Sequence, residues 1–197
     1  METGNLKDYE LVNQFIQTND EASLELLINR HKDRIYTYIL LIVRNQTLAE
    51  DIFQDTFIKV INTLRKGKYQ EKGVFLSWVM RIAHNLIIDY YRKEKNLKTV
   101  SNDDNDLDMF NSQKFAEDNV EDGMVKDQIV TDVRKLIDQL PDDQKQVILL
   151  RHYGDLSFKE IADQTGVSIN TALGRMRYAL INLRKLIKEH DLSLTIS

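Results

Sequence analysis

Helix-breaking residues are scarce in this chain. Pro141 is its only proline, and seven glycines are spread over 197 residues. Because these two residue types most often end helices and form tight turns, their scarcity favours long helices over strands joined by short turns. The apolar residues agree, since Leu24, Leu27 and Ile28 begin a series that recurs at spacings of three, four and seven positions. The sequence therefore predicts an all-α fold.

Charge and periodicity divide this predicted fold into three segments. Residues 8–96 carry three apolar stripes at helical spacing and are expected to form a helical bundle. Residues 97–123 have no such periodicity, and nine acidic residues stand against two lysines between 101 and 128. A segment of this kind buries too little apolar surface to offset the entropy of ordering, so we expect a flexible acidic linker. Residues 124–190 are helical again, which gives two small helical domains, the second containing a helix-turn-helix, joined by the linker.

The chain lacks the residues that several classes of site require. It has no cysteine, which excludes disulfides, zinc–thiolate clusters and cysteine nucleophiles. Its four histidines are widely spaced and match no metal-binding pattern, and no glycine-rich phosphate loop or nucleophile motif is present. We therefore expect no enzyme activity, no cofactor and no metal. No apolar run approaches the roughly 20 residues that span a bilayer, and no secretory signal begins the chain, so a cytoplasmic protein is expected.

The strongest local pattern lies in the second helical segment. Ser157 and Glu160 have the spacing of a capping box, which would start a short helix. Gly166 suits a left-handed turn after that helix, and Ser168 can cap a second, longer helix. A short helix, a glycine turn and a basic helix together describe a helix-turn-helix, whose second helix enters the major groove of DNA.

That second helix carries the candidate DNA contacts. Its first turns would face base edges, and its arginines could reach guanine edges or phosphates. The candidates are Ser168, Asn170, Thr171, Leu173, Arg175 and Arg177. Five basic and no acidic residues lie between 175 and 188, so the local charge suits a phosphate backbone despite a net charge of −4. An ordinary helical hairpin with solvated arginines remains the alternative to this interpretation.

Three parts of the sequence resemble one family. Residues 49–57 read AEDIFQDTF, residues 75–93 form a basic and aromatic helical stretch, and Leu140 and Pro141 precede the GDLSFKEIA of residues 154–162. In this order they resemble the polymerase-binding segment, the promoter-melting helix and the C-terminal DNA-binding domain of bacterial sigma factors of the extracytoplasmic-function (ECF) group. The resemblance implies an alternative sigma factor that binds core RNA polymerase, directs it to specific promoters and assists promoter opening.

The resemblance also assigns roles to residues that share helix faces. Asp51, Gln54 and Asp55, at i, i+3 and i+4, would dock on a coiled coil of the largest polymerase subunit. Thr47 and Glu50 have the spacing of a capping box that would start their helix. The implied contacts to the minus-ten promoter element are Trp78, Arg81, Asn85, Arg92 and Lys93. A core position is equally open for Trp78, because tryptophan is usually largely buried.

The implied minus-thirty-five contacts are the helix-turn-helix candidates named above, and promoter DNA and an anti-sigma factor are the implied partners besides polymerase. Leu173, Tyr178 and Leu180 stand where the family often has basic residues, so its base preference cannot be transferred. A helix-turn-helix repressor or activator with a helical sensor domain is the second hypothesis, and it leaves the polar face around Asp51 unexplained. An enzyme is the third and weakest hypothesis. His84, in the basic aromatic helix, is expected to be structural or DNA-facing.

Overall fold

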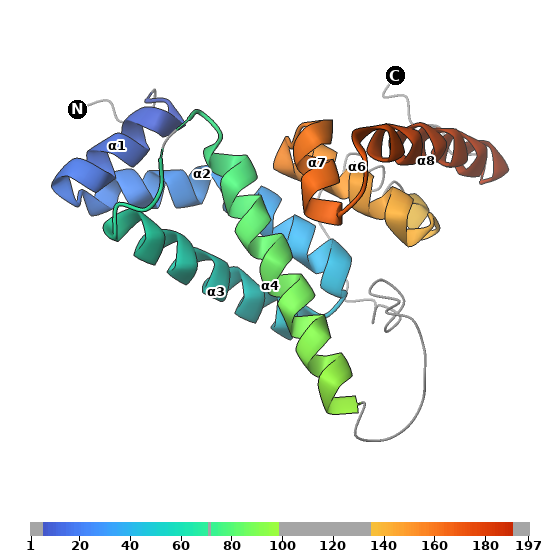
Figure 1. The fold of residues 1–197 in the computed structure, drawn as a ribbon, viewed down its shortest axis with the longest axis horizontal. Coiled ribbons are helices and arrows are strands. Elements are labelled where there is room, and N and C mark those ends of the chain that lie inside the picture. Colours follow the sequence, from blue (N-terminus) through green and yellow to red (C-terminus); the bar gives the residue numbers. More distant parts are fainter. Residues whose placement is uncertain (1–5, 71, 99–134, 191–197) are drawn as a thin grey trace. The chain divides into compact units, whose positions relative to one another are not determined.

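The computed structural model describes residues 6–70, 72–98 and 135–190, and every regular element in these ranges is a helix (Figure 1). The all-α prediction is therefore confirmed. The predicted linker, residues 97–123, lies outside the described residues except for its first two positions, which end the fourth helix. The helices are α1 Asp8–Thr18, α2 Glu21–Val43, α3 Gln46–Arg65, α4 Phe75–Lys98, α6 Asp142–Gly154, α7 Phe158–Thr165 and α8 Ile169–Glu189.

Two compact units account for these helices, one built from α1 to α4 and the other from residues 135–138 with α6 to α8. In the first unit α2 contacts each of the other three helices, and α3 also contacts α1 and α4 (Figure 1). The apolar stripes predicted from periodicity meet in its core. Fully buried members of these stripes include Leu27, Ile35, Ile39, Val60, Leu64, Val79 and Ile87, and Leu11, Phe15 and Ala83 are buried with them.

Short polar connections set where the helices of the first unit begin and end. Asp20 caps α2, because its carboxylate accepts hydrogen bonds from the backbone amides of Ala22 and Ser23. Arg44 ends α2 in a left-handed conformation, and the next residue, Asn45, caps α3 by accepting a hydrogen bond from Leu48 N at 2.9 Å.

The capping box predicted at Thr47 is wrong. Thr47 lies inside the first turn of α3, and the Glu50 carboxylate accepts a hydrogen bond from the Gln46 side chain instead. The helix begins earlier than the pattern suggested because Asn45 lies directly after the residue that ends α2.

The second unit follows the helix-turn-helix pattern. Asp142 opens α6 directly after Pro141, as predicted. Ser157 and Glu160 form the predicted capping box at the start of α7, and Gly166 ends that helix at φ +69°. Contacts between α7 and α8 hold the two helices of the motif together.

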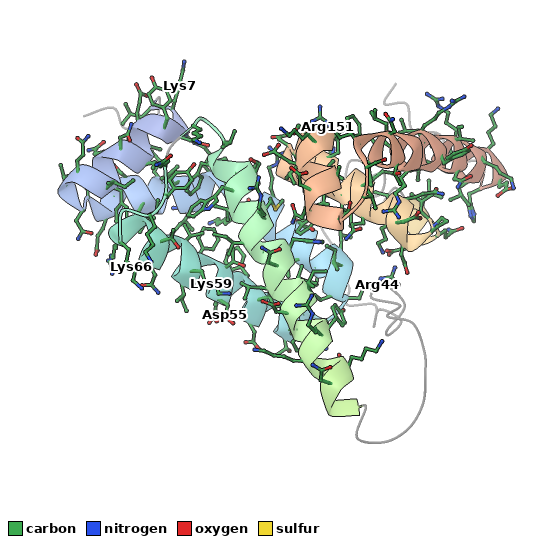
Figure 2. All side chains as sticks on the ribbon, in the orientation of Figure 1. Lys7, Arg44, Asp55, Lys59, Lys66 and Arg151 are labelled. Carbon is green, nitrogen blue, oxygen red and sulfur yellow. The ribbon has the colours of Figure 1, made fainter. Side chains whose placement is uncertain are left out.

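Two basic residues of α6 stabilise this unit. Arg151 donates a 2.8 Å hydrogen bond to Leu156 O, and its guanidinium lies 5.6 Å from the Phe158 ring centroid, so it holds the connection into α7 (Figure 2). Lys145 is fully buried and paired with Asp138. A buried ammonium is tolerated only when its charge is compensated in this way.

Candidate nucleic-acid and polymerase interfaces

The middle of α3 presents a polar face to solvent. Asp51, Gln54 and Asp55 are all exposed, and none of them forms an ion pair with another described side chain. The opposite side of the helix is fixed in the core by Ile52, Phe57 and other apolar residues. Figure 2 shows Asp55 at the outer edge of α3. The predicted grouping of the three polar side chains on one accessible face is therefore what the fold produces.

Sequence analysis missed a residue of this face. Ile58 lies one turn after Gln54 and is 55% exposed, so it adds an accessible apolar side chain to this face. Its spacing of seven from Asp51 places it in line with the polar residues. The spacing was visible in the sequence, but Ile58 lies outside the apolar stripe of this helix, and the site was built from its polar residues alone.

A second exposed face runs along α4. Arg81 and Asn85 are exposed and four residues apart, so they lie one above the other on the helix surface. Arg92 and Lys93 continue the exposed surface toward the C-terminal end of α4. Arg92 lies 3.8 Å from Asp89, an exposed pair that contributes little to stability and that a phosphate could replace. The other side of α4 is buried in the bundle.

Three rings form an aromatic cluster at the start of α4: Tyr69, Phe75 and Trp78. The Trp78 ring lies 4.1 Å from Tyr69 and 5.9 Å from Phe75, measured between centroids. Phe75 and Tyr69 are buried, whereas Trp78 is half-buried. Trp78 therefore packs in the wall of the bundle while part of its surface stays accessible.

The loop between α3 and α4 contributes Tyr69 to this cluster. Gly67 and Gly73, near its two ends, have φ values of +61° and +72°, a region that favours glycine over other residues. Lys66, Lys68 and Lys72 are exposed along it. The loop is thus a cationic segment beside the partly accessible Trp78.

His84 is a buried structural residue and does not face DNA, which settles the two roles expected from the sequence. It is 1% exposed, and its Nδ1 lies 2.7 Å from the hydroxyl of Tyr38, which is also buried. Burial disfavours the imidazolium and lowers the pKa of His84 from 6.5 to about 4. Burial also raises the pKa of Tyr38 well above its usual value. The pair is therefore a neutral hydrogen bond that joins α2 to α4.

The first turns of α8 carry the predicted groove contacts. Ser168 caps the helix by accepting a 3.1 Å hydrogen bond from Thr171 N, and the two hydroxyls lie 2.9 Å apart. Both side chains are thus partly used in starting the helix. Asn170 and Leu173 are exposed, and Leu173 offers a 43% exposed apolar surface. An exposed leucine can contact a thymine methyl group but cannot donate a hydrogen bond.

The two arginines of α8 differ in their surroundings. Arg177 is exposed. Arg175 is half-buried, and its Nε lies 3.1 Å from the Asp143 carboxylate of α6. A side chain held in this way is oriented before any DNA arrives, and its charge is already partly balanced. The structure therefore separates two residues that the sequence placed in one group.

Several apolar residues of α8 are exposed beyond the predicted contacts. Tyr178 is 62% exposed, and the others are Ile169, Leu180 and Ile181. Their departure from the basic residues of the family was visible in the sequence at Tyr178 and Leu180. This helix is consequently less cationic than its position in a helix-turn-helix suggests, and its accessible surface is mixed apolar and basic.

The described residues contain no group of histidine, aspartate and glutamate side chains that could hold a metal ion. Among the same residues, no helix is both long enough and apolar enough to cross a membrane.

Comparison with protein-family models finds two matches, in chain order. The sigma-70 region 2 model matches residues 27–97, and the sigma-70 region 4 model matches residues 131–178. The first match includes α3 and α4 with their exposed faces, and the second includes α6, α7 and the first half of α8. Residues 8–18, which form α1, precede both matches.

Curated relatives cover nearly the whole chain. RNA polymerase sigma factor SigV of Bacillus subtilis is 31% identical over 173 residues, which are 88% of this chain and 96% of the relative. ECF RNA polymerase sigma factor SigW of the same organism is 29% identical over 178 residues, covering 88% and 94% of the two chains.

Solved structures share the fold at lower identity. The sigma factor RpoE of Bartonella quintana, determined in complex with the anti-sigma factor NepR, has a TM-score of 0.64 at 20% identity and covers 84% of this chain and 96% of its own. CnrH in complex with the cytosolic domain of CnrY has a TM-score of 0.61 at 18% identity, covering 92% and 97%.

Proposed function

The chain belongs to the extracytoplasmic-function group of RNA polymerase sigma factors, and we propose that three exposed helix faces divide its work in transcription initiation. As a member of this family it binds core RNA polymerase, directs it to specific promoters and assists promoter opening. The proposal assigns particular residues to each of these steps. Its domains are residues 8–96 for polymerase and the minus-ten element and residues 124–190 for the minus-thirty-five element.

The α3 face docks on core polymerase. Asp51, Gln54 and Asp55 supply acceptors and donors, and Ile58 supplies an exposed apolar surface beside them. An interface combines these elements when an apolar centre excludes water around polar contacts that fix the orientation. The grouping of Asp51, Gln54 and Asp55 on one exposed face of α3, within the region 2 match, is the single observation that carries this assignment.

The α4 face holds the minus-ten element. Arg81, Arg92 and Lys93 are exposed cations for the phosphates, and Asn85 can donate to and accept from base edges. Trp78, half-buried against Tyr69, offers part of its ring for stacking on an unpaired base. Rigid rings beside a cationic loop suit single-stranded DNA, so this face supports strand separation as well as binding.

The start of α8 enters the major groove at the minus-thirty-five element. Asn170, Thr171 and Leu173 lie nearest the bases, and Ser168 mainly positions the helix through its cap. Arg177 is available for a phosphate or a guanine, whereas Arg175 is held by Asp143 and must give up part of this ion pair to contact DNA. The mixed surface of α8 predicts modest affinity for duplex DNA alone, which two linked domains on one polymerase would raise through effective concentration.

The proposal also covers the protein's lack of catalysis, its location and a further partner. The protein acts as a binding factor without a catalytic centre or cofactor of its own, and RNA synthesis belongs to the polymerase. It works in the cytoplasm, where polymerase and promoters are. The sigma factor RpoE, which has a similar fold, was determined in complex with the anti-sigma factor NepR, and this supports an anti-sigma partner for this chain.

A binding measurement with matched charge reversals tests the polymerase face. Asp51→Arg and Ile58→Glu should each weaken binding to purified core polymerase by at least about tenfold, because each places an unmatched charge in the interface. Asp33→Arg makes the same reversal at an exposed carboxylate of α2 and should leave the affinity unchanged. Equal losses for all three variants, or no loss for any, would contradict the assignment of this face.

A further inference from the structure

A carboxylate at the start of α1 contacts two residues of α2, in addition to the apolar packing of the helix. Asp8, the first residue of α1, accepts a 2.6 Å contact from Arg30 on one oxygen and lies 2.7 Å from His31 Nε2 on the other. Arg30 also donates a 2.8 Å hydrogen bond to Leu6 O, just before the helix. Because α1 precedes both matched family regions, neither match gives this contact a role.

His31 has a second contact on its other side. Its ring lies 5.9 Å from the Phe75 ring, at an interplanar angle of 42°. His31 is buried, and Phe75 is 2% exposed at the first position of α4. The imidazole is therefore held at one edge by Asp8 and presents its ring to Phe75. Its orientation can change only if one of these two contacts is lost.

Phe75 passes this constraint to the rest of the aromatic cluster. Its centroid lies 6.3 Å from Tyr69, in an edge-on arrangement, and 5.9 Å from Trp78. Tyr69 is the buried residue of the loop between α3 and α4, so this loop is anchored to the bundle through the cluster. An unbroken series of contacts thus runs from α1 through His31 to the accessible ring of Trp78.

We propose that Asp8 and His31 are positioning residues for promoter opening, which fix Phe75 and thereby hold Tyr69, Trp78 and the α3–α4 loop in the arrangement that receives the unpaired minus-ten strand. The proposal rests on the assignment of that element to the α4 face. It gives α1, outside the matched regions, a part in strand separation. Placement matters here because an aromatic ring stacks on a base only when the two are held face to face at close distance.

The structure offers a matched pair of variants. His31→Leu removes both the bond to Asp8 and the ring against Phe75 while keeping an apolar side chain in the buried site. Arg30→Gln removes the other strong bond to Asp8, at an exposed residue whose hydrogen bonds go to Asp8 and Leu6 O and not to the cluster. If Asp8 only anchors α1, the two variants should behave alike. If His31 positions Phe75, only His31→Leu should disturb the cluster, and Asp8→Asn tests the part of Asp8.

The first measurement uses the fluorescence of Trp78, the only tryptophan of the chain. In the free protein, His31→Leu should shift its emission to the red and increase its quenching by acrylamide, and Arg30→Gln should do neither. Asp8→Asn, which keeps the side-chain volume but loses the charge, should change the emission in the same direction by less. This variant provides the test if His31→Leu does not fold.

The second measurement uses holoenzyme assembled at saturating core polymerase. The rate of promoter opening, followed by permanganate reactivity of minus-ten thymines, should fall roughly 2- to 30-fold for His31→Leu, the range of typical coupling between linked sites. Binding to core polymerase should not change, and Arg30→Gln should open promoters at the normal rate.

The two measurements have separate consequences. Equal effects of His31→Leu and Arg30→Gln in either measurement would overturn the proposal, as would a changed Trp78 emission without slower opening. If the unaltered protein opened no promoter at all, the assignment of the α4 face would fail, while the emission data would still decide whether His31 sets the cluster.

Discussion

Tyr38 and His84 make the stability of the first unit depend on pH. Their side chains form a 2.7 Å hydrogen bond between α2 and α4, and both are essentially inaccessible to water. The phenol remains neutral because burial raises its pKa, so it can donate to the imidazole. Burial also lowers the pKa of His84 from 6.5 to about 4, since the imidazolium would lose its hydration in this site.

The sign and size of the effect follow from this shift. Between pH 6.5 and about 4 the unfolded chain binds a proton at His84 that the folded unit excludes. The contribution is therefore fully present above pH 6.5 and is lost progressively as the pH falls toward 4. A shift of this size corresponds to about 3 kcal/mol of unfolding free energy, since one pKa unit is worth about 1.4 kcal/mol.

Urea unfolding followed by Trp78 fluorescence measures this contribution, because the only tryptophan lies in the first unit. The comparison is with His84→Asn, whose side chain keeps an acceptor near the position of Nδ1 but does not titrate. Its smaller volume lowers stability at every pH, so only the difference in pH dependence is informative. The unaltered protein should lose about 2–3 kcal/mol more than His84→Asn between roughly pH 7.5 and 4.5. Parallel stability curves would refute the reasoning.

Three shorter predictions concern the second unit. Gly166→Ala should lower its unfolding free energy by about 1 kcal/mol in thermal denaturation, because φ is +69° although an added Cβ would meet no atom within 4 Å; an unchanged melting temperature would contradict the strained turn. Asp143→Asn should raise the affinity for promoter duplex by up to about fivefold in an anisotropy titration by releasing Arg175, and an equal gain for the control Asp163→Asn would argue for net charge alone. Arg177→Ala should reduce the slope of log affinity against log salt by about one, and an unchanged slope would exclude a phosphate contact.

Local patterns predicted much of the fold. The apolar stripes gave the helices, and Ser157, Glu160 and Gly166 gave the start and end of α7, because capping and left-handed turns depend on residues a few positions apart. The prediction at Thr47 was wrong because Asn45 and Thr47, two positions apart, are both residue types that can cap the start of α3. The cap was decided by the two-residue connection after α2, which leaves Asn45 as the residue before α3.

The candidate site was less accessible to sequence reasoning. Exposure of Asp51 and Arg81 follows from helix periodicity, since the opposite faces are apolar. The contact of Asp143 with Arg175 joins residues on different helices, and no local pattern contains such a contact. Ile58 was missed because the candidate face was chosen by polar residue type, although its spacing of seven from Asp51 places it on the same side of the helix.

Transcription by purified core polymerase, with and without this protein, tests the central claim most directly when it is run on a library of promoters. We expect initiation at a defined subset of promoters that share minus-ten and minus-thirty-five sequences, with loss of initiation for Asp51→Arg and retention for Asp33→Arg. Failure to bind core polymerase or to initiate at any promoter, together with sequence-specific binding of duplex DNA by the protein alone, would contradict the account and favour a helix-turn-helix repressor.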